Sequence, residues 1–428
     1  MLENIYKEVE NKENPITEDE QKELMKKFVS QLPDNLQNIM IIPPDYTRKH
    51  SGAGNLTYYL YELLKDDVNI TIMPALGTHR PMNEEEIMDM FGDKIPLKEF
   101  KVHDYINDTV SIGTVPKEYV NKVSSGNVNR AINVKINQEL VNDKYDLIIS
   151  VGQVLPHGVV GMSNYNKNIL VGCGGRRMID VSHYVGAAYG MEKLLGKDHS
   201  PVRDILDYAE NNFLQDTNII YILTVNSTEI NPATNLTDLL GLFIGRERKT
   251  FEKAVEASQR FNIVQLDKPV KKMVVYMDEE EFKSTWLACK AIYRTRLVIE
   301  DEGELIVLSP GLEGFGENEK MDNLIRKYGY VGKENVINLV NENQDLDNNL
   351  AVAAHLIHGS TNGRFKVKFA TDKLSKKELN NVNHGHISYK KAINKYDPKK
   401  LDYGYNTLEN GEEVFYIENP ATGLWTLK

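Results

Sequence analysis

Short apolar runs alternate with longer amphipathic stretches through the first two thirds of the chain. A run of four to eight apolar residues between polar turns is typical of a buried strand, whereas apolar residues spaced three and four apart are typical of a helix. Such runs predict strands at residues 38–43, 68–73, 145–151 and 218–225. Helices are predicted after Thr17, where Glu20 completes a capping-box pattern, at 56–64, after Asn83 and at 246–259. The alternation predicts an α/β fold whose sheet is mostly parallel.

A second α/β unit is predicted after the polar segment Asp-Lys-Pro-Val at residues 267–270. Its predicted strands are 272–276, 304–308, 336–340 and 365–369, and its predicted helices are 279–294 and 349–356. The acidic runs Glu84–Glu86 and Glu279–Glu281 are interpreted as first turns of helices. We therefore predict two domains, an N-terminal one over residues 1–267 and a smaller C-terminal one over 268–428. We expect the tail at 414–425 to form a strand and loop that pack back on the first domain.

Charged and polar side chains directly follow three of the predicted strands. These are Asp45 and Arg48 after the first strand, His79 and Arg80 after the second, and His157 after the third. In an open parallel sheet, ligands bind beyond the carboxyl ends of the strands, so we expect these side chains to converge on one crevice. On its own, the stretch from Asp45 to Arg48 also fits a turn with a surface ion pair. The functional interpretation is an anion site whose guanidinium binds carboxylate or phosphate.

The segment from Tyr145 to Gly190 is dense in glycine and carries His157, Lys167 and His183. It lacks an ordinary amphipathic pattern. We therefore expect it to contribute little to the core, and its glycines to let the backbone approach a ligand closely. Residues 172–175, Gly-Cys-Gly-Gly, could cradle a phosphate with their N–H groups. They match neither the dinucleotide-binding nor the P-loop pattern.

Composition and charge narrow the class of protein. The 428 residues are 41% hydrophobic and 26% charged, as in ordinary soluble globular proteins. The formal charge of −11 argues against nucleic acid as a partner, because phosphate binding needs a basic surface, but a local basic pocket can still bind a small anion. Two cysteines, Cys173 and Cys289, predict no disulfide framework and a reducing, cytoplasmic setting. No apolar run approaches the ~20 residues that span a bilayer, and the N-terminus has no signal-peptide pattern, so no membrane association is expected.

Residue types alone leave the chemistry open. His79, His157 and His183 could be acid–base groups, or three zinc ligands that leave an open catalytic position, although no HExxH pattern is present. Lys167 fits a solvated loop lysine, and a lysine in such a pocket can also carry a cofactor covalently. Cys173 has no base beside it in sequence and is expected to be a small buried residue. The pairs His355/His358 and His384/His386 are expected to be structural or at the surface.

Three motifs stand in a fixed order along the chain. They are Pro44-Asp45-Tyr-Thr-Arg48, then Gly77-Thr-His79-Arg80-Pro81, then Pro156-His157 with Lys167 ten residues on and His183 sixteen further. In order and spacing they resemble the lactate racemase family (LarA-like), whose members are racemases and epimerases that use a nickel-pincer nucleotide. The similarity covers most of residues 38–310. It implies an N-terminal α/β domain, a smaller C-terminal α/β domain, and an active site in the cleft between them.

The resemblance implies four residues at the cofactor. Lys167 is similar to the lysine that holds the nickel-pincer nucleotide through a thioamide, and His183 to the histidine that binds its nickel. Lys290 falls about where the family has a lysine that reaches the site from the C-terminal domain. Thr47, inside the first motif, is also expected at the cofactor.

The resemblance implies four further residues for catalysis. His79 and His157 match two acid–base histidines on opposite faces of the substrate carbon, and Asp45 and Arg48 match a pair that supports the site and helps to bind anionic groups. In such a reaction one base takes the hydroxyl proton while hydride leaves the carbon for the cofactor. Hydride then returns to the other face, and the second histidine returns the proton.

Some positions depart from the lactate racemases. Where that group has Ser-Gly-Gly-x-Lys, this chain has Ser163-Asn-Tyr-Asn-Lys167. Met277-Asp-Glu-Glu replaces a Gly-Gly-Tyr-Pro stretch, and Trp286 and Leu287 lie where polar substrate contacts would be expected. The tail over 405–425 looks more like members thought to act on larger hydroxy acids. The expected substrate is therefore an α-hydroxy acid larger than lactate, such as a sugar acid.

The leading hypothesis is thus an isomerase, a racemase or 2-epimerase that acts on a small anionic α-hydroxy acid. Its expected partners are that substrate and the enzymes that make the cofactor. Two other hypotheses stay open: a non-catalytic paralogue that binds the cofactor or a sugar acid, and a zinc-dependent hydrolase that uses the same histidines.

Overall fold

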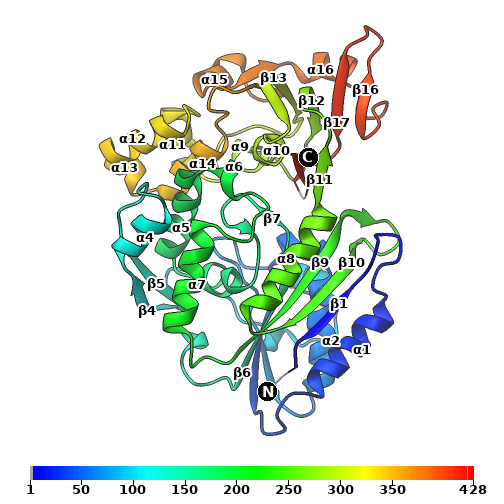
Figure 1. Cartoon of the computed structure of the whole chain (residues 1–428), viewed down its shortest axis with the longest axis vertical. Helices are drawn as coiled ribbons and strands as arrows, with labels where there is room; N and C mark the ends of the chain where they lie inside the picture. Colours follow the sequence, from blue (N-terminus) through cyan, green and yellow to red (C-terminus); the bar gives the residue numbers. More distant parts are fainter. Residues whose placement is uncertain (1–2, 422) are drawn as a thin grey trace. The chain divides into compact units, whose positions relative to one another are not determined.

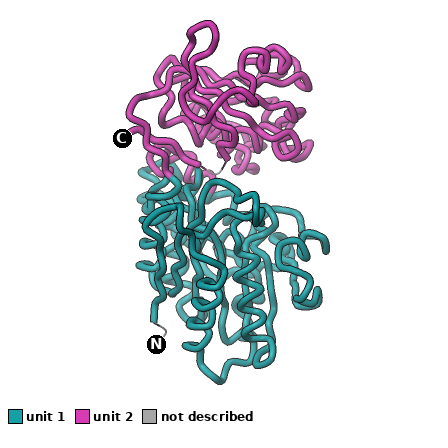
Figure 2. Tube along the Cα trace, turned by 90° about the vertical axis from the view of Figure 1, so that its right-hand side faces the viewer, with its two compact units in different colours: residues 1–182, 196–262 teal, residues 183–195, 263–428 magenta. Residues whose placement is uncertain are grey.

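The chain divides into two compact units, residues 1–182 with 196–262 and residues 183–195 with 263–428 (Figure 2). The computed structural model describes residues 3–421 and 423–428, so Thr422 of the tail lies outside the described residues. Segment 183–195 belongs to unit 2 although residues of unit 1 precede and follow it in sequence. Over the described part of the chain, no helix has both the length and the apolar character needed to cross a membrane.

A six-stranded sheet forms the centre of unit 1 (Figure 1). Its order is β1 (Ile5–Glu8), β10 (Leu236–Gly245), β9 (Ile219–Asn231), β6 (Leu147–Gln153), β2 (Asn38–Ile42) and β3 (Asn69–Ile72). β9, β6, β2 and β3 run parallel, which confirms the four predicted strands and their direction. The antiparallel edge of β10 and β1 was not predicted. β2 and β6 are buried almost throughout, because both faces of such a strand are covered.

Helices pack around this sheet. The predicted ones are α1 (Glu18–Val29), α2 (Ala53–Leu64), α3 (Glu84–Phe91) and α8 (Arg248–Asn262), and Thr17 and Glu20 form the predicted capping box of α1. Not predicted were α4 (Lys117–Val123), α5 (Arg176–Tyr189), α7 (Pro201–Phe213) and the hairpin of β4 (Thr109–Val115) and β5 (Ile132–Asn137). α5 begins in unit 1, and its residues from His183 onward belong to unit 2.

The glycine-dense segment is part of the core, contrary to our expectation. After the short strands β7 (Pro156–His157) and β8 (Gly161–Met162), residues 168–172 form a π-helical turn, η4. A Cβ on Gly152 would lie 1.8 Å from the Asn164 amide nitrogen, and one on Gly174 would lie 2.1 Å from the Leu170 carbonyl oxygen. At these two positions glycine lets the protein pack against itself and not against a ligand.

Unit 2 holds a second six-stranded sheet. Its order is β15 (Gly385–Ile387), β14 (Lys366–Ala370), β13 (Ile299–Leu308), β12 (Val270–Tyr276), β17 (Glu413–Ile417) and β16 (Gly404–Thr407), and only β16 is antiparallel to its neighbour. The tail strand β18 (Leu424–Leu427) pairs in parallel with β11 (Ile263–Leu266) in the same unit. The helices are α6 (Met191–Leu194), α9 (Thr285–Ala288), α10 (Lys290–Thr295), α11 (Glu319–Tyr328), α12 (Lys333–Glu342), α13 (Gln344–Asp347), α14 (Leu350–His358), α15 (Lys376–Asn381) and α16 (Tyr389–Lys395).

Two predictions in unit 2 were wrong. Residues 336–340 lie inside helix α12 and not in a strand, and the buried Val336 and Val340 stand four apart, which is the spacing of one helix face. The predicted helix 279–294 is a turn followed by α9 and α10. The Asp278 carboxylate accepts the N–H groups of Glu280 and Glu281. Glu279–Glu281 therefore form that turn and do not begin a helix.

Candidate active site in unit 1

Three loops of unit 1 meet at the carboxyl ends of the parallel strands. Pro44, just after β2, and Ala75, just after β3, form an isolated parallel bridge. The Gly77 N–H donates to the Gly172 carbonyl at 2.7 Å and so joins the loop after β3 to the glycine-dense segment. The loops that carry Asp45, His79 and the segment after Lys167 therefore lie side by side, at the edge of the sheet where ligands bind in such folds.

Asp45 and His79 form a hydrogen-bonded pair in which Nδ1 of the histidine lies 2.6 Å from Oδ2 of the carboxylate. Asp45 is only 6% exposed, whereas the His79 side chain is 58% exposed. Burial alone would raise the pKa of Asp45. The hydrogen bond and charge of His79 outweigh it, with help from the Thr47 hydroxyl, which donates to Oδ1 at 2.6 Å, and from the charge of Arg48, so the pKa lies below its usual value.

This pair sets the tautomer of the histidine. Because Asp45 is ionised, it accepts the proton on Nδ1 of His79, and the neutral ring then presents the lone pair of Nε2. His79 is thereby arranged as a proton acceptor. Thr47, expected at the cofactor, is bound to Asp45 and contributes to this arrangement.

Lys167 stands directly before η4 at the ends of β2 and β6. Its neighbour Asn168 fixes that place, because the Asn168 amide donates to the Ile42 carbonyl at 3.1 Å and to the Ser150 hydroxyl at 3.0 Å. Burial first, and then the positive charges of Arg48 and Arg203, lower the pKa of Lys167 to about 8, while the negative charge of Asp45 opposes them. Around pH 8, about half of this amine is therefore uncharged and nucleophilic, unlike an ordinary lysine.

The loop before Lys167 keeps a glycine-like backbone without glycine. Asn164 and Tyr165 have φ of 63° and 59°, in the left-handed region that glycine enters without strain. Asn tolerates this region, but a tyrosine there is strained. The Tyr165 ring is held in place by stacking on Phe251, with ring centroids 5.1 Å apart, and its hydroxyl donates to the Arg246 carbonyl at 3.2 Å.

His157 lies in β7, and its Nδ1 accepts the Val159 N–H at 3.1 Å. A ring whose Nδ1 is an acceptor carries the proton of its neutral form on Nε2. The neutral His157 ring therefore presents an N–H hydrogen-bond donor on Nε2. In their neutral forms these two histidines of the candidate site have opposite tautomers, His79 with an acceptor on Nε2 and His157 with the proton there.

The lactate racemase N-terminal domain is the family whose model matches this chain, over residues 1–192. The chain is 28% identical over 207 residues to the lactate racemase of Thermoanaerobacterium thermosaccharolyticum, an alignment that covers 46% of this chain and 44% of that protein. It is also 28% identical over 180 residues to the lactate racemase of Lactiplantibacillus plantarum, covering 40% and 36% of the two chains. Residues 1–192 are thus similar to the N-terminal domain of the lactate racemases, which makes this part of the chain LarA-like. The alignments span less than half the length of these curated relatives.

Two solved structures share the fold of this LarA-like chain. A structural-genomics protein from Thermotoga maritima matches with a TM-score of 0.81 and 26% identity, over 98% of this chain and 100% of that one. The lactate racemase apoprotein of Thermoanaerobacterium thermosaccharolyticum matches with a TM-score of 0.68 and 19% identity, over 97% and 90%. The α/β architecture predicted from the sequence is thereby confirmed.

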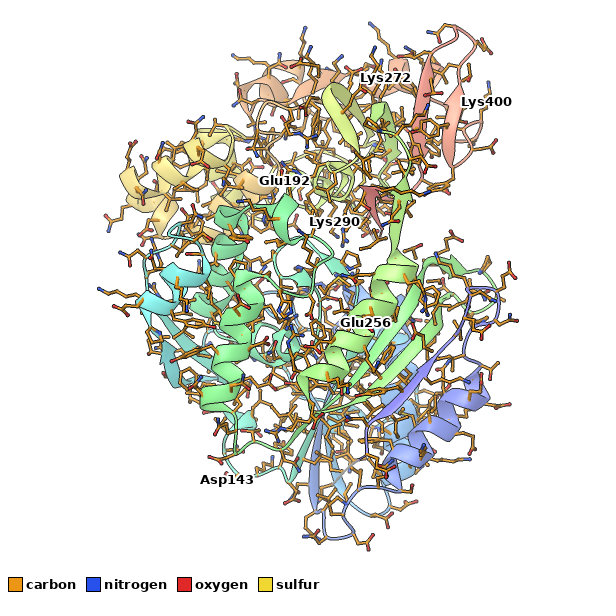
Figure 3. All side chains as sticks on the ribbon, in the orientation of Figure 1. Asp143, Glu192, Glu256, Lys272, Lys290 and Lys400 are labelled. Atoms are coloured by element: carbon orange, nitrogen blue, oxygen red, sulfur yellow. The ribbon has the colours of Figure 1, made fainter. Side chains whose placement is uncertain are left out.

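Two predicted site residues of the LarA-like chain belong to unit 2. His183 lies on α5, near enough to His358 to act on its charge: burial holds the pKa of His358 far below its usual value, and His355, His183 and Arg296 lower it further. Lys290 begins α10, with its ammonium 5.3 Å from the centre of the Phe282 ring (Figure 3). Their roles at a cofactor stay predictions.

Three histidines of unit 2 and the two cysteines are buried. His355, His358 and His384 are buried in unit 2, and the described residues contain no group of three His, Cys, Asp or Glu side chains that could hold a metal ion. Cys173 is fully buried, as predicted, and Cys289 is buried as well.

Sequence reasoning missed Arg203. This arginine of α7 is fully buried and lies near Lys167, whose pKa it helps to lower. A signal was present, because Arg203 stands among the apolar residues of an amphipathic helix whose buried face is Pro201, Val202, Ile205, Leu206 and Ala209. A charged residue on such a face is rarely buried without a specific partner.

Proposed function

We propose that this LarA-like chain is a racemase or 2-epimerase of an α-hydroxy acid that works with a nickel-pincer nucleotide attached to Lys167. The observation that supports this most is the grouping of the Asp45–His79 pair and the low-pKa Lys167 at the carboxyl ends of β2, β3 and β6. A base and a reactive amine side by side are what such a reaction requires.

The two histidines would divide the proton transfers. His79, with Nδ1 bound to ionised Asp45, takes the hydroxyl proton of the substrate on Nε2, and the carboxylate stabilises the imidazolium that results. On the family resemblance we propose His157, whose neutral ring presents an N–H on Nε2, as the second acid–base histidine.

The residues present fit the cofactor at its attachment point. Lys167 offers an amine with a pKa of about 8, and the left-handed backbone at residues 164–165 is the one that a Gly-Gly pair would adopt readily. We propose that His183 binds the nickel and that Thr47 and Lys290 contact the nucleotide, on the family resemblance. When bound, the cofactor supplies acceptance and return of a hydride at the substrate α-carbon.

Arg48 is proposed to hold the substrate carboxylate. Its positive charge acts on both Asp45 and Lys167, so an anion bound to it would lie beside the base and the attachment point. We further propose a substrate larger than lactate, such as a sugar acid, on the sequence departures at Trp286, Leu287 and the tail. The maturation enzymes that make the cofactor are proposed as partners, and the two free cysteines favour a reducing, cytoplasmic setting.

The test is co-production of the full chain with the cofactor-making enzymes, followed by intact-mass and nickel analysis. We expect a covalent mass increase that maps to Lys167, together with bound nickel. Lys167→Arg keeps the charge but offers no acylable amine, so it should stay unmodified. Wild-type chain with unmodified Lys167 and no nickel would overturn the proposal.

Activity is then measured on a panel of α-deuterated hydroxy acids that includes lactate and sugar acids. We expect inversion of at least one acid with its α-deuterium retained, because hydride that leaves the carbon returns to it. Ligand-induced stabilisation without inversion of any acid would favour the non-catalytic paralogue instead.

A further inference from the structure

Arg203 binds the segment that leads to Lys167. It is completely buried, and its guanidinium donates to the Met162 carbonyl at 2.8 Å and the Asn164 carbonyl at 3.2 Å. It also donates to the side-chain oxygen of Asn166. These acceptors lie one, three and five residues before Lys167, so the planar guanidinium group binds the loop at three points.

The loop needs such support because of its backbone. Asn164 and Tyr165 both lie in the left-handed region, and for tyrosine this costs free energy that the surrounding structure must offset. The Asn164 carbonyl, bound by Arg203, belongs to the peptide group between these two residues. The Arg203 guanidinium also lies 4.4 Å from the centre of the Phe251 ring, on which Tyr165 stacks. Arg203 therefore contacts the strained turn on its backbone side and on its aromatic side.

The charge of Arg203 is only indirectly balanced. The Asn166 amide donates to Asp207 at 2.6 Å and to Glu210 at 3.0 Å, so it stands between those carboxylates and the guanidinium. Burial lowers the pKa of Arg203 to about 10, and at neutral pH it is still a cation. A buried cation beside a lysine disfavours protonation of that lysine, because two like charges would then share a poorly solvated site.

We propose that Arg203 is a positioning residue for Lys167: its guanidinium holds residues 162–166 in a turn that two glycines would adopt unaided, and its buried charge keeps the Lys167 amine available for acylation. This inference rests on the proposed function only in taking Lys167 as the attachment residue.

Competitive acetylation of the full chain, produced without the maturation enzymes, tests the proposal. The Lys167 amine attacks a carbonyl carbon of acetic anhydride, acetate leaves, and the amine proton passes to solvent. The labelled fraction of the Lys167 peptide is measured by mass spectrometry from pH 6.5 to 10. In the wild-type chain the midpoint should fall near 8.

Arg203→Gln should move this midpoint up by about half a unit or more, which corresponds to about threefold slower labelling at pH 7.5. Arg203→Lys keeps the charge but not the fork, so it should leave the midpoint near the wild-type value while the loop becomes more sensitive to protease. A purely structural role for Arg203 predicts no shift of the midpoint. A folded Arg203→Gln chain with the wild-type midpoint would overturn the proposal.

Arg248→Gln is the matched control. Arg248 lies 4.9 Å from the same Phe251 ring, but it binds Asp198 at 2.6 Å and Asp207 at 3.1 Å. Its loss should leave the Lys167 midpoint unchanged. A shift as large as that of Arg203→Gln would show that any cation of this cluster suffices, and the specific role of Arg203 would fail.

Asn164→Gly with Tyr165→Gly separates the two parts of the proposal. Added to Arg203→Gln, these glycines should restore protease resistance of the loop, because they adopt the turn without strain, but they should not restore the midpoint. They also provide a folded background if Arg203→Gln alone does not fold. If they restore neither resistance nor folding, the turn-holding role is wrong. The labelling needs no cofactor, so it stands or fails independently of whether Lys167 is modified in co-produced enzyme.

Discussion

The hydrogen bond between Asp45 and His79 fixes which nitrogen of the histidine can take a proton. Asp45→Asn keeps the shape but removes the charge that stabilises the imidazolium, and its amide can favour the wrong tautomer. We expect turnover to fall by about 10²- to 10⁴-fold, the usual contribution of general acid–base catalysis, with a smaller change in KM. Rates of inversion by the cofactor-loaded enzyme measure this.

Thr47→Val is the companion variant for Asp45→Asn. It removes one hydrogen bond from a neutral hydroxyl to Oδ1 of the same carboxylate and leaves the charge in place. About 1.5 kcal/mol is expected from such a bond to a charged group, or roughly a tenfold loss. Equal losses in the two variants would contradict a dominant role for the Asp45 charge.

Lys167 makes stability depend on pH in a definite direction. The folded chain releases the proton of this amine near pH 8, because burial and then the Arg48 and Arg203 charges lower its pKa, whereas the unfolded chain holds it to about 10.4. Between these values the unfolded state binds more protons, so stability rises with pH. Below about pH 8, folding carries the full cost of the buried ammonium.

Lys167→Met should therefore be more stable than the wild-type chain at pH 7, and its advantage should shrink from about pH 8 to 10. Urea unfolding of both chains at four pH values measures the difference, in which the other titrating groups cancel. A difference that does not change with pH would mean that Lys167 is as well solvated in the folded chain as in the unfolded one.

A directed chain of hydrogen bonds joins α9 to α14 in unit 2. Since Thr285 donates to the Phe315 carbonyl at 2.9 Å, it accepts from the Tyr330 hydroxyl at 2.7 Å, and that oxygen in turn accepts from Nε2 of His355 at 2.8 Å. Burial lowers the pKa of His355 to about 3, with a smaller effect of His384, so the ring is neutral and the chain of bonds is complete.

Tyr330→Phe should lower the free energy of unfolding by about 1–3 kcal/mol, because it leaves the His355 N–H and the Thr285 oxygen buried without this partner. Tyr328→Phe is the control, since its hydroxyl binds Asp345 at the surface and its loss should stay within about 0.5 kcal/mol. Chemical denaturation measures both variants. Equal stability of the two would contradict a buried network.

How far the sequence predicted these elements depended on where the deciding contacts lie. The strands ending near Asp45 and His79 were predictable because a run of apolar residues is itself the signal of a buried strand, and a group just past its end falls at the ligand edge. Strand β10 was missed although residues 239–244, Leu-Leu-Gly-Leu-Phe-Ile, form such an apolar run, and its antiparallel pairing with β9 has no local signal. Residues 336–340 were predicted as a strand because a short apolar run fits helix and strand alike.

Within the candidate site, the sequence likewise predicted some residues and missed others. Asp45 and His79 could be paired from their strand-end positions, but Arg203 lies on helix α7, which was not predicted, so no sequence signal placed it beside the loop before Lys167. The left-handed backbone at Tyr165 could not be predicted from its residue type, since tyrosine disfavours that conformation and only its aromatic and arginine contacts offset the cost.

Unit 2 takes part of its core from the middle of the chain. Met191 and Leu195 form a buried cluster with Leu424, against which Ile263 packs. In the same segment, Glu192 (Figure 3) binds Arg296 at 2.8 Å, and the Arg296 side chain is only 1% exposed. The piece 183–195 is therefore an integral part of unit 2, and residues 263–428 alone lack it.

A fragment of residues 263–428 should consequently fail to unfold cooperatively. It loses the apolar contacts of Met191 and Leu195 and leaves the buried Arg296 without its carboxylate. Loss of the carboxylate partner costs about 3 kcal/mol of unfolding free energy. This is the lower end of the range for buried ion pairs, because Glu192 is one-third exposed. The total unfolding free energy of a domain is only roughly 5–15 kcal/mol. Near-UV circular dichroism during heating measures the cooperativity of unfolding, and the same fragment with residues 183–195 joined by a flexible linker should regain a sharp transition.

Glu192→Gln in the full chain isolates the contribution of the ion pair. A fragment that melts as sharply without the segment as with it would show that unit 2 folds on its C-terminal residues alone.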